Sequence, residues 1–372
     1  MIINYRAITE LNTQVRRLAY VSQLLRLVGH KPLSKQSLLS KLIDWSASNS
    51  EFLENHLDST GAVHSEKQRK NTAALRYIDF AMGLGVLTRI ANMYRPTRIG
   101  AVLSTMLYEI SDGDENPFCL KEHEKIFFLY QLFQRDADLL LCVVDMIRQG
   151  GSHSLKDLQN NFQVAYLDRL IAKIAESSQE HIKRLLSGRR NEIKTTWKNP
   201  KRYAEHIVPP RLHWLLDMGF VQLTRQSGDV FFHFTDAGKR FVDVLPRLST
   251  ADISEVTDEW QNKDFFSSVC PSLFPFRKYV YWKDADECVR HEVIQKYIVD
   301  AFKEFRRTSV PKISLTQGML YTCIRSAVDS DFLVDKEDLL EWFSTPRVFD
   351  DHRYEVRTSA RENEAYFIMM RV

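Results

Sequence analysis

Apolar residues recur at spacings of three and four along most of this chain, which is the period of helices with one buried face. The pattern predicts helices over residues 18–27, 35–46, 122–133, 136–149, 155–162 and 167–186, and later over 287–306, 315–328 and 336–343. A final hairpin is predicted over 353–359 and 364–370. Only 13 Gly and 11 Pro occur in 372 residues, which also favours long helices and short connections. The sequence therefore predicts a mainly α protein with small β-hairpins.

One pattern of helix, glycine turn, two short strands and Thr-x-x-Gly occurs twice. The first copy, LRYIDFAMGLGVLTRIANMYRPTRIG, covers residues 75–100. The second copy, RLHWLLDMGFVQLTRQSGDVFFHFTDAG, covers residues 211–238. Alternating apolar residues in both copies are typical of half-buried strands, and Ser-Gly-Asp in the second copy is typical of a tight hairpin turn.

The glycines and threonines of this pattern have predictable backbone roles. Gly83, Gly85 and Gly219 follow predicted helices, where a left-handed cap would strain other residues. Thr97 and Thr235 stand where their side chains can cap the next helix.

Both copies resemble the third helix, the two-stranded wing and the exit helix of winged-helix proteins. The resemblance implies tandem winged-helix units joined by long helices, with residues 1–115 as one unit and 116–250 as a helical region plus a second unit. Residues 251–372 are expected to form a third, acidic unit, although they lack the glycine and Thr-x-x-Gly marks. In winged-helix proteins the third helix commonly enters the major groove of DNA, and the wing touches the backbone or the minor groove.

Charge is distributed unevenly along the chain. The overall formal charge is only +3, but the three segments carry +3, +5 and −5 in chain order. A basic first part and an acidic last part indicate different partners for the two ends. We expect double-stranded DNA at the basic part and a protein partner, such as an ATPase or a second copy, at the C-terminal third.

The densest basic stretch spans residues 181–211 and directly precedes the second predicted wing. Its basic residues are Lys183, Arg184, Arg189, Arg190, Lys194, Lys198, Lys201, Arg202 and Arg211, with Trp197 and Tyr203 among them and only Glu192 and Glu205 opposing. Lys and Arg neutralise backbone phosphates and release counterions, so we predict DNA contacts here and at Arg225 on the wing. The alternative is an ordinary solvated helix face.

A smaller basic patch precedes the first predicted wing. It consists of Lys67, Arg69, Lys70 and Arg76, at near-helical spacings. These residues are also candidate DNA contacts, with a solvated surface as the alternative.

Other chemistries find little support. Glu192 and Lys194 match the Glu-x-Lys of metal-dependent nucleases, with Asp168 upstream, but they lie among helix-favouring or linker residues and not on a strand. The five cysteines lack zinc-ligand spacing, and neither a Gly-x-Ser-x-Gly elbow nor a phosphate-binding glycine loop occurs. We therefore expect no catalytic residues, no metal and no cofactor. The aromatic-rich stretch 260–282 is either core beneath a connection or a partner anchor.

The absence of a long uncharged apolar run predicts no membrane span, no signal segment and a soluble, cytoplasmic protein with reduced cysteines. The function hypothesis is a non-catalytic DNA-binding subunit of a larger prokaryotic-type assembly, such as a restriction, antiviral defence or plasmid-maintenance system. The alternative is a scaffold that acts through protein contacts, since the chain also loosely resembles the kleisin and winged-helix accessory subunits of condensin-like complexes.

Overall fold

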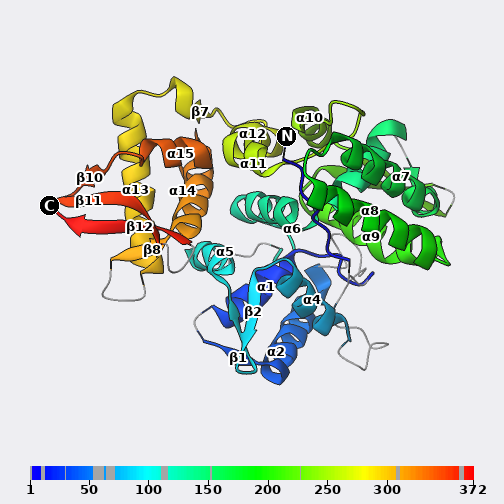
Figure 1. Ribbon diagram of the computed structural model, residues 1–372. Helices are drawn as coiled ribbons and strands as arrows, with labels where there is room; N and C mark the ends of the chain where they lie inside the picture. Colours follow the sequence, from blue (N-terminus) through cyan, green and yellow to red (C-terminus); the bar gives the residue numbers. More distant parts are fainter. Residues whose placement is uncertain are drawn as a thin grey trace.

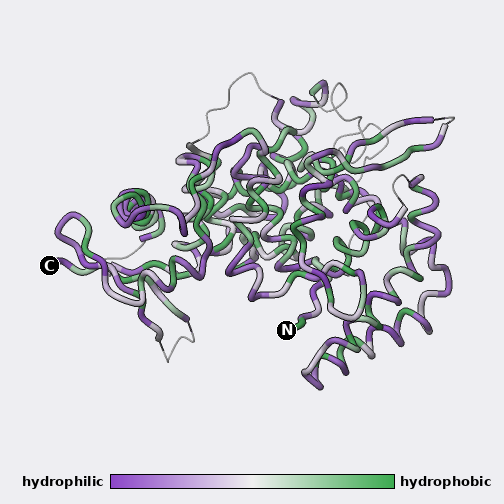
Figure 2. The backbone as a smooth tube through the Cα atoms, turned by 90° about the horizontal axis from the view of Figure 1, so that it is seen from above, coloured by the Kyte–Doolittle hydropathy of each residue, from purple (hydrophilic) through white to green (hydrophobic). Residues whose placement is uncertain are grey.

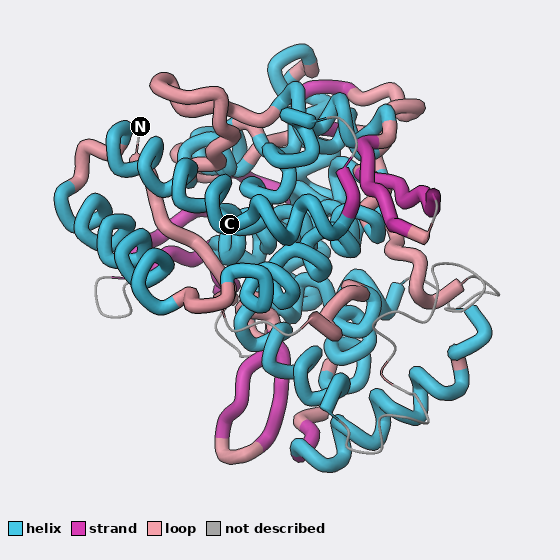
Figure 3. The backbone as a smooth tube through the Cα atoms, turned by 90° about the vertical axis from the view of Figure 1, so that its right-hand side faces the viewer, coloured by secondary structure: helices cyan, strands magenta, loops and turns pink. Residues whose placement is uncertain are grey.

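The computed structural model describes residues 2–9, 13–29, 31–52, 63, 72–109, 116–150, 153–226, 228–306, 311–359 and 364–372. Helices dominate, and short strands form small sheets at the periphery (Figure 1, Figure 3). The predicted class, mainly α with small β-elements, is confirmed. Among the described residues, no helix has both the length and the apolar character needed to cross a bilayer.

The first part of the chain forms a helix–strand–helix–helix–hairpin unit, which we name the first repeat. Its elements are α1 (Ala19–Val28), β1 (Leu33–Ser34), α2 (Lys35–Ser48), α4 (Thr72–Gly83), β2 (Leu87–Ile90), β3 (Met93–Pro96) and α5 (Arg98–Glu109). The sheet order is β1-β3-β2, so the strand that follows the first helix pairs with the second strand of the hairpin. Ala91 and Asn92 both have positive φ, which gives the hairpin its tight turn.

The middle of the chain repeats this connection order. The second repeat begins in the second half of α6 (Glu122–Gly150) and continues through β4 (His153–Ser154), α7 (Leu155–Glu176), α8 (Glu180–Thr196), α9 (Pro200–Asp217), β5 (Val221–Gln226), β6 (Asp229–Phe234) and α10 (Asp236–Val244). The sheet order β4-β6-β5 matches that of the first repeat.

A third repeat closes the chain. A connection containing α11 (Asp258–Lys263), α12 (Phe265–Leu273) and β7 (Val280–Tyr281) leads into α13 (Glu287–Phe305), β8 (Lys312–Ser314), α14 (Leu315–Asp329), β9 (Phe332–Leu333), α15 (Lys336–Trp342), β10 (Arg347–Phe349), β11 (His352–Ser359) and β12 (Glu364–Arg371). The sheet order β10-β11-β12-β8 again pairs the early strand with the last one. All three repeats therefore pair an early strand with the last strand of a hairpin, although the third adds β10 to its sheet and inserts β9 between α14 and α15. Membership of the winged-helix family stays a prediction.

In each of the first two repeats, the threonine of the Thr-x-x-Gly sequence forms hydrogen bonds that connect the end of the hairpin to the start of the next helix. In the second repeat, the Thr235 hydroxyl donates to the carbonyl oxygen of Gly219 (2.7 Å) and accepts from the N–H of Gly238 (3.1 Å). Gly238 lacks a side chain for a steric reason, because a Cβ there would lie 1.9 Å from the carbonyl oxygen of Phe220.

The first repeat has the same junction. The Thr97 hydroxyl donates to Gly85 (2.7 Å) and accepts from Gly100 (2.9 Å), where a Cβ would lie 1.9 Å from the carbonyl oxygen of Val86. The predicted helix caps at both threonines are confirmed. Gly85 and Gly219 have the predicted positive φ, but Gly83 does not, because it is still the last residue of α4.

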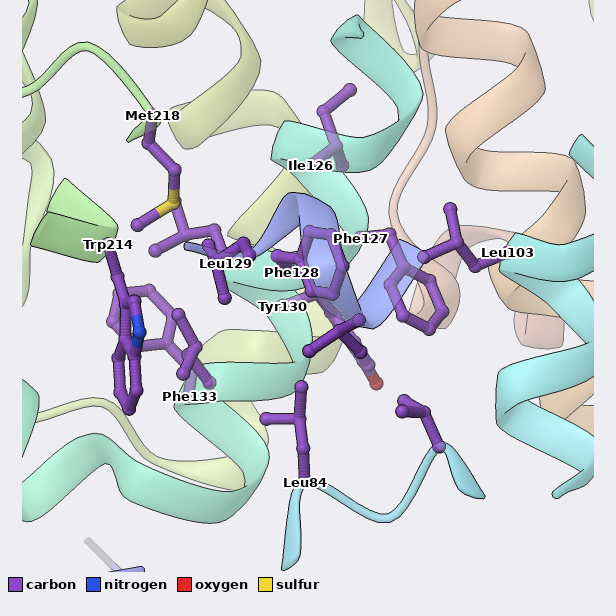
Figure 4. Packing of buried hydrophobic residues seen from close by; sticks show 14 of the residues in the cluster. Leu84, Leu103, Ile126, Phe127, Phe128, Leu129, Tyr130, Phe133, Trp214 and Met218 are labelled. Atoms are coloured by element: carbon purple, nitrogen blue, oxygen red, sulfur yellow. The ribbon is translucent and has the colours of Figure 1, made fainter. Parts of the chain in front are cut away.

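Helix α6 runs through the centre of the molecule and contacts all three repeats (Figure 1). Its first half carries Phe127, Phe128 and Phe133, which are fully buried. In Figure 4 these side chains lie between Leu103 on one side and Trp214 on the other. Hydrophobic segments accordingly gather in the middle of the molecule, and hydrophilic ones prevail at its edge (Figure 2). One apolar cluster thus joins the repeats.

Buried ion pairs surround the kink of α6 at Asp136, where the backbone leaves the helical region (φ −138°). Lys173 donates to Asp138 at 2.5 Å and lies 2.9 Å from Glu255, while Arg169 donates to Glu255 at 2.7 Å. All four side chains are at most 2% exposed. These ion pairs attach α7 and the stretch around Glu255 to α6.

One predicted helix boundary is wrong. The sequence suggested a break near residues 163–166, but α7 continues to Glu176 and the chain turns at 177–179 before α8. No Gly or Pro marks the real break, and Ser177 caps the end of α7 in an extended conformation. As a result, much of the basic stretch lies on one separate helix.

Candidate nucleic-acid interface

Helix α8 and the start of α9 carry most of the basic stretch predicted from the sequence. Ile182, Leu186 and Ile193 are buried and fix which side of α8 faces the protein. Lys183, Arg190 and Lys194 are seven and four residues apart, so they share one outer flank of the helix. With a rise of about 1.5 Å per residue, this flank extends over about 16 Å.

The connection between α8 and α9 is held by stacked aromatic rings. The rings of Trp197 and Tyr203 lie 4.8 Å apart and nearly parallel, at 3°. The Arg189 guanidinium lies 5.9 Å from the Trp197 ring centre and 2.7 Å from Glu192. The side chain of Asn199 caps α9 by accepting from the N–H of Arg202. These contacts give the basic residues around the connection a defined position.

Six cations of this region have no carboxylate partner among the described residues. They are Arg184, Arg190, Lys194, Lys198, Lys201 and Arg202, which we name the α8 basic surface. Arg190 is half-buried and the other five are exposed. Positive charges without internal partners are available to phosphates, the ligands that Lys and Arg neutralise on nucleic acids.

Two other predicted contacts are partly neutralised inside the protein. Lys183 pairs with Glu180 at 3.2 Å, and only 37% of its side chain is exposed. Arg189 pairs with Glu192 and is only 12% exposed. Arg189 therefore supports the α8–α9 connection more than it faces outward.

The prediction that Arg211 contacts DNA is wrong. Its side chain is fully buried, and its guanidinium donates to both oxygens of Asp136, at 2.8 and 2.7 Å. The guanidinium also donates to the carbonyl oxygens of Ile207 and Ile8, each at 3.0 Å. These contacts use four of its five N–H donors, and because the side chain is fully buried no phosphate can reach it.

The burial of α9 also limits which part of that helix can meet DNA. Residues 207–215 are all buried against the core, so only the first two turns of α9 present side chains outward. The winged-helix resemblance places the third helix in the groove. Here the exposed positive charge lies on α8, the helix that precedes it, on the α8–α9 connection, and on the first turn of α9 at Lys201 and Arg202.

The predicted wing contact, Arg225, is exposed near the tip of the β5–β6 hairpin, opposite Val230. In the first repeat, Lys67, Arg69 and Lys70 lie outside the described residues. Arg76 is about half exposed and lies 3.6 Å from Asp79, so its charge is partly balanced within α4.

The nuclease-like residues do not form a metal centre. Glu192 and Lys194 lie on a helix, and Glu192 is paired with Arg189. Across the described ranges, no three His, Cys, Asp or Glu side chains are grouped closely enough to hold a metal ion. Cys142, Cys270 and Cys323 are buried free thiols, and burial raises the pKa of each.

Most aromatic residues of 260–282 belong to the core, as one of the two interpretations held. Phe265 and Phe266 are fully buried beside Tyr130 of α6. Phe276 and Tyr281 are exposed, at 98% and 39%.

No known protein family matches this sequence, and no curated protein is significantly similar to it.

Proposed function

We propose that this protein binds double-stranded DNA, without catalysing a reaction, through the α8 basic surface. The observation that carries the proposal is that α8, the α8–α9 connection and the first turn of α9 carry six cations that lack carboxylate partners among the described residues. Like charges gathered on one surface repel one another and attract a ligand of opposite charge. Duplex DNA, with one negative charge per about 1.7 Å of axis, is a suitable counterpart.

Contacts of this kind recognise the DNA backbone and not its sequence. Lys and Arg on a helix flank reach phosphates, whereas base recognition needs side chains inside a groove. The helix expected to enter the groove is buried over most of its length. The proposal is therefore binding with low sequence preference, in which Arg225 on the hairpin adds a further phosphate contact.

The role in a larger assembly is part of the same proposal. The basic α8 lies on the right of Figure 1, and the acidic third repeat lies on the opposite side with α6 between them. A chain built this way can hold DNA at one end and a protein at the other. A non-catalytic subunit of a defence, restriction or plasmid-maintenance complex would use both ends.

The test is binding of the full chain to a labelled random duplex at low salt. The variant combines Arg184→Gln, Lys194→Gln, Lys198→Gln and Lys201→Gln, all exposed positions. A matched control removes four exposed lysines from the acidic third, with Lys278→Gln, Lys283→Gln, Lys296→Gln and Lys303→Gln. We expect the first variant to bind about tenfold or more weakly, and the control to change far less. If the unaltered chain does not bind duplex at low salt, the condensin-like scaffold hypothesis takes the place of this proposal.

A further inference from the structure

The connection into the third repeat carries a small patch of exposed apolar side chains. Phe276, between α12 and β7, is 98% exposed, and Val280 and Tyr281, the two residues of β7, are 45% and 39% exposed. β7 lies at the top of the molecule in Figure 1. A single exposed apolar residue needs no explanation, but three within six residues, one of them a fully projecting aromatic ring, are typical of an interaction site.

β7 also has an unpaired main-chain edge. Within the described ranges it pairs with β9 alone, and Val280 donates its N–H to the carbonyl oxygen of Asp331 at 2.9 Å. Successive residues of a strand direct their amide groups to opposite edges, so those of Tyr281 face away from β9. The Tyr281 carbonyl oxygen accepts from Ala285 at 3.1 Å, but its N–H has no acceptor in the described part of the chain. An open strand edge can pair with another strand.

The strand is preceded by one positive charge that the protein does not neutralise. Arg277 lies 2.6 Å from Asp331 and also pairs with Glu122, so its charge is balanced. Lys278 is exposed and has no carboxylate partner among the described residues. The surface is therefore positive on the side where the chain enters β7.

The strand is followed by an excess of negative charge. Asp284 and Asp286 are exposed, and neither has a cation partner in the residues that the structure describes. The cations close to them are matched in number by the carboxylates of the adjacent α13–α15 surface, with Lys283, Arg290 and Arg347 against Glu287, Asp338 and Glu341. The surface is therefore negative on the side where the chain leaves β7.

We propose that two copies of this chain associate through β7 and its flanks, about a two-fold axis that makes the two strands antiparallel. In such a contact the same patch meets itself, so the residues before the strand in one copy face the residues after it in the other. Lys278 of each copy then lies near Asp284 and Asp286 of the other. The exposed apolar side chains of the two patches cover one another.

The distribution of charge favours a second copy over a different protein. The patch carries both signs, and the antiparallel contact brings opposite charges together at both ends at once, whereas a partner of one sign would leave one end unmatched. The patch is small, and a contact below about 1,200 Å² in total is of the transient class. The dimer is therefore weak and depends on protein concentration. It is independent of the DNA proposal, because α8 lies on a different side of the molecule in Figure 1.

The first experiment is sedimentation equilibrium of the full chain without DNA, from about 5 to about 300 µM, a range suited to transient contacts. We expect a monomer–dimer equilibrium. Phe276→Ser removes a side chain that takes no part in the core, and it should weaken the dimer about tenfold or more, as the loss of an aromatic anchor does. Val164→Ser on α7, where Val164 is 61% exposed, is the matched control and should change nothing. A chain that stays monomeric throughout, or equal weakening by both variants, overturns the proposal.

A charge reversal tests the antiparallel arrangement. Lys278→Glu in one protein, and Asp284→Lys with Asp286→Lys in another, each bring like charges together at both ends of the contact. Each protein alone should dimerise about fivefold more weakly than the unaltered chain. An equimolar mixture of the two should regain the original affinity, because the mixed dimer again pairs opposite charges at both ends. A mixture that associates no better than its components contradicts the arrangement.

Discussion

Arg211 and Asp136 form a fully buried, two-pronged ion pair, with the Arg211 Nε and one Nη each donating to a different carboxylate oxygen. The pair joins α9 to the kink of α6. The N-terminal arm is held at the same point, because Ile8 donates its N–H to Asp136 at 2.8 Å and its carbonyl oxygen accepts from Arg211. Burial raises the pKa of Asp136, and the charge of Arg211 opposes that rise. Arg211 belongs to the most basic stretch of the sequence, but its role is to stabilise the fold.

Replacing Arg211 should therefore cost stability and leave the DNA surface intact. Arg211→Met leaves the carboxylate of Asp136 buried without its counter-charge, and we expect a loss of about 3–5 kcal/mol in the free energy of unfolding. The double variant Arg211→Met with Asp136→Asn should recover part of this loss, because an amide oxygen can still accept from Ile8. Urea denaturation measures both, and an Arg211→Met protein as stable as the unaltered chain would refute the structural role.

The Thr-x-x-Gly junction predicts a second stability effect. Gly238→Ala places a Cβ 1.9 Å from the carbonyl oxygen of Phe220. Neither atom can move away by a side-chain rotation, because a Cβ and a carbonyl oxygen are both fixed to the backbone. We expect a loss of about 2 kcal/mol or more, as for other overpacked sites.

The matched control for this substitution is Gly188→Ala on α8, where nothing lies within 4 Å of the added methyl group. It should stabilise the protein by about 0.5–1 kcal/mol, since alanine favours a helix. Thermal unfolding of the two variants compares them directly. Similar changes in both would show that the close approach at Gly238 is relieved at little cost.

His213 predicts a pH effect on stability. Burial, together with the nearby charges of Arg17 and Arg16, holds the pKa of His213 well below its usual value. Below pH of about 6.5 the unfolded chain takes up a proton at this residue and the folded chain does not. The free energy of unfolding therefore includes the full contribution of neutral His213 above pH of about 6.5. This contribution is lost as the pH falls from there toward the pKa of His213 in the folded protein.

The measurement is the free energy of unfolding of the protein and of His213→Gln between pH 7 and pH 5. The difference between the two isolates this residue from other titrating groups, such as Asp217, whose pKa burial raises to about 6. We expect the advantage of the unaltered protein to shrink by up to about 1.4 kcal/mol per pH unit below 6.5. A pH-independent difference would contradict the prediction.

Local sequence patterns were sufficient to predict the first two hairpins and the caps of the helices that follow them. Thr97 and Thr235 act through residues close in the chain, so their roles follow from spacing alone. The third repeat has no such marks, and its relation to the other two becomes visible only when β8 is seen to pair with β12, about fifty residues later.

The basic stretch shows where sequence reasoning fails. Arg211 and Lys201 look alike in a count of charges, and the partner that separates them, Asp136, is distant in the chain. The apolar neighbours of Arg211, from Ile207 to Leu212, were the available signal of burial. The break between α7 and α8 had no comparable signal, so the separate α8 could not be predicted.

The salt dependence of duplex binding tests the central claim most directly. Each phosphate contact contributes about 0.9 to the slope of log K against log salt concentration. If Arg184, Lys194, Lys198 and Lys201 each contact a phosphate, replacing all four by Gln should reduce that slope by about 3 to 4. The matched variant with four lysines removed from the acidic third should keep the original slope. An unchanged slope in the α8 variant, or an equal reduction in both variants, would contradict DNA binding through the α8 basic surface.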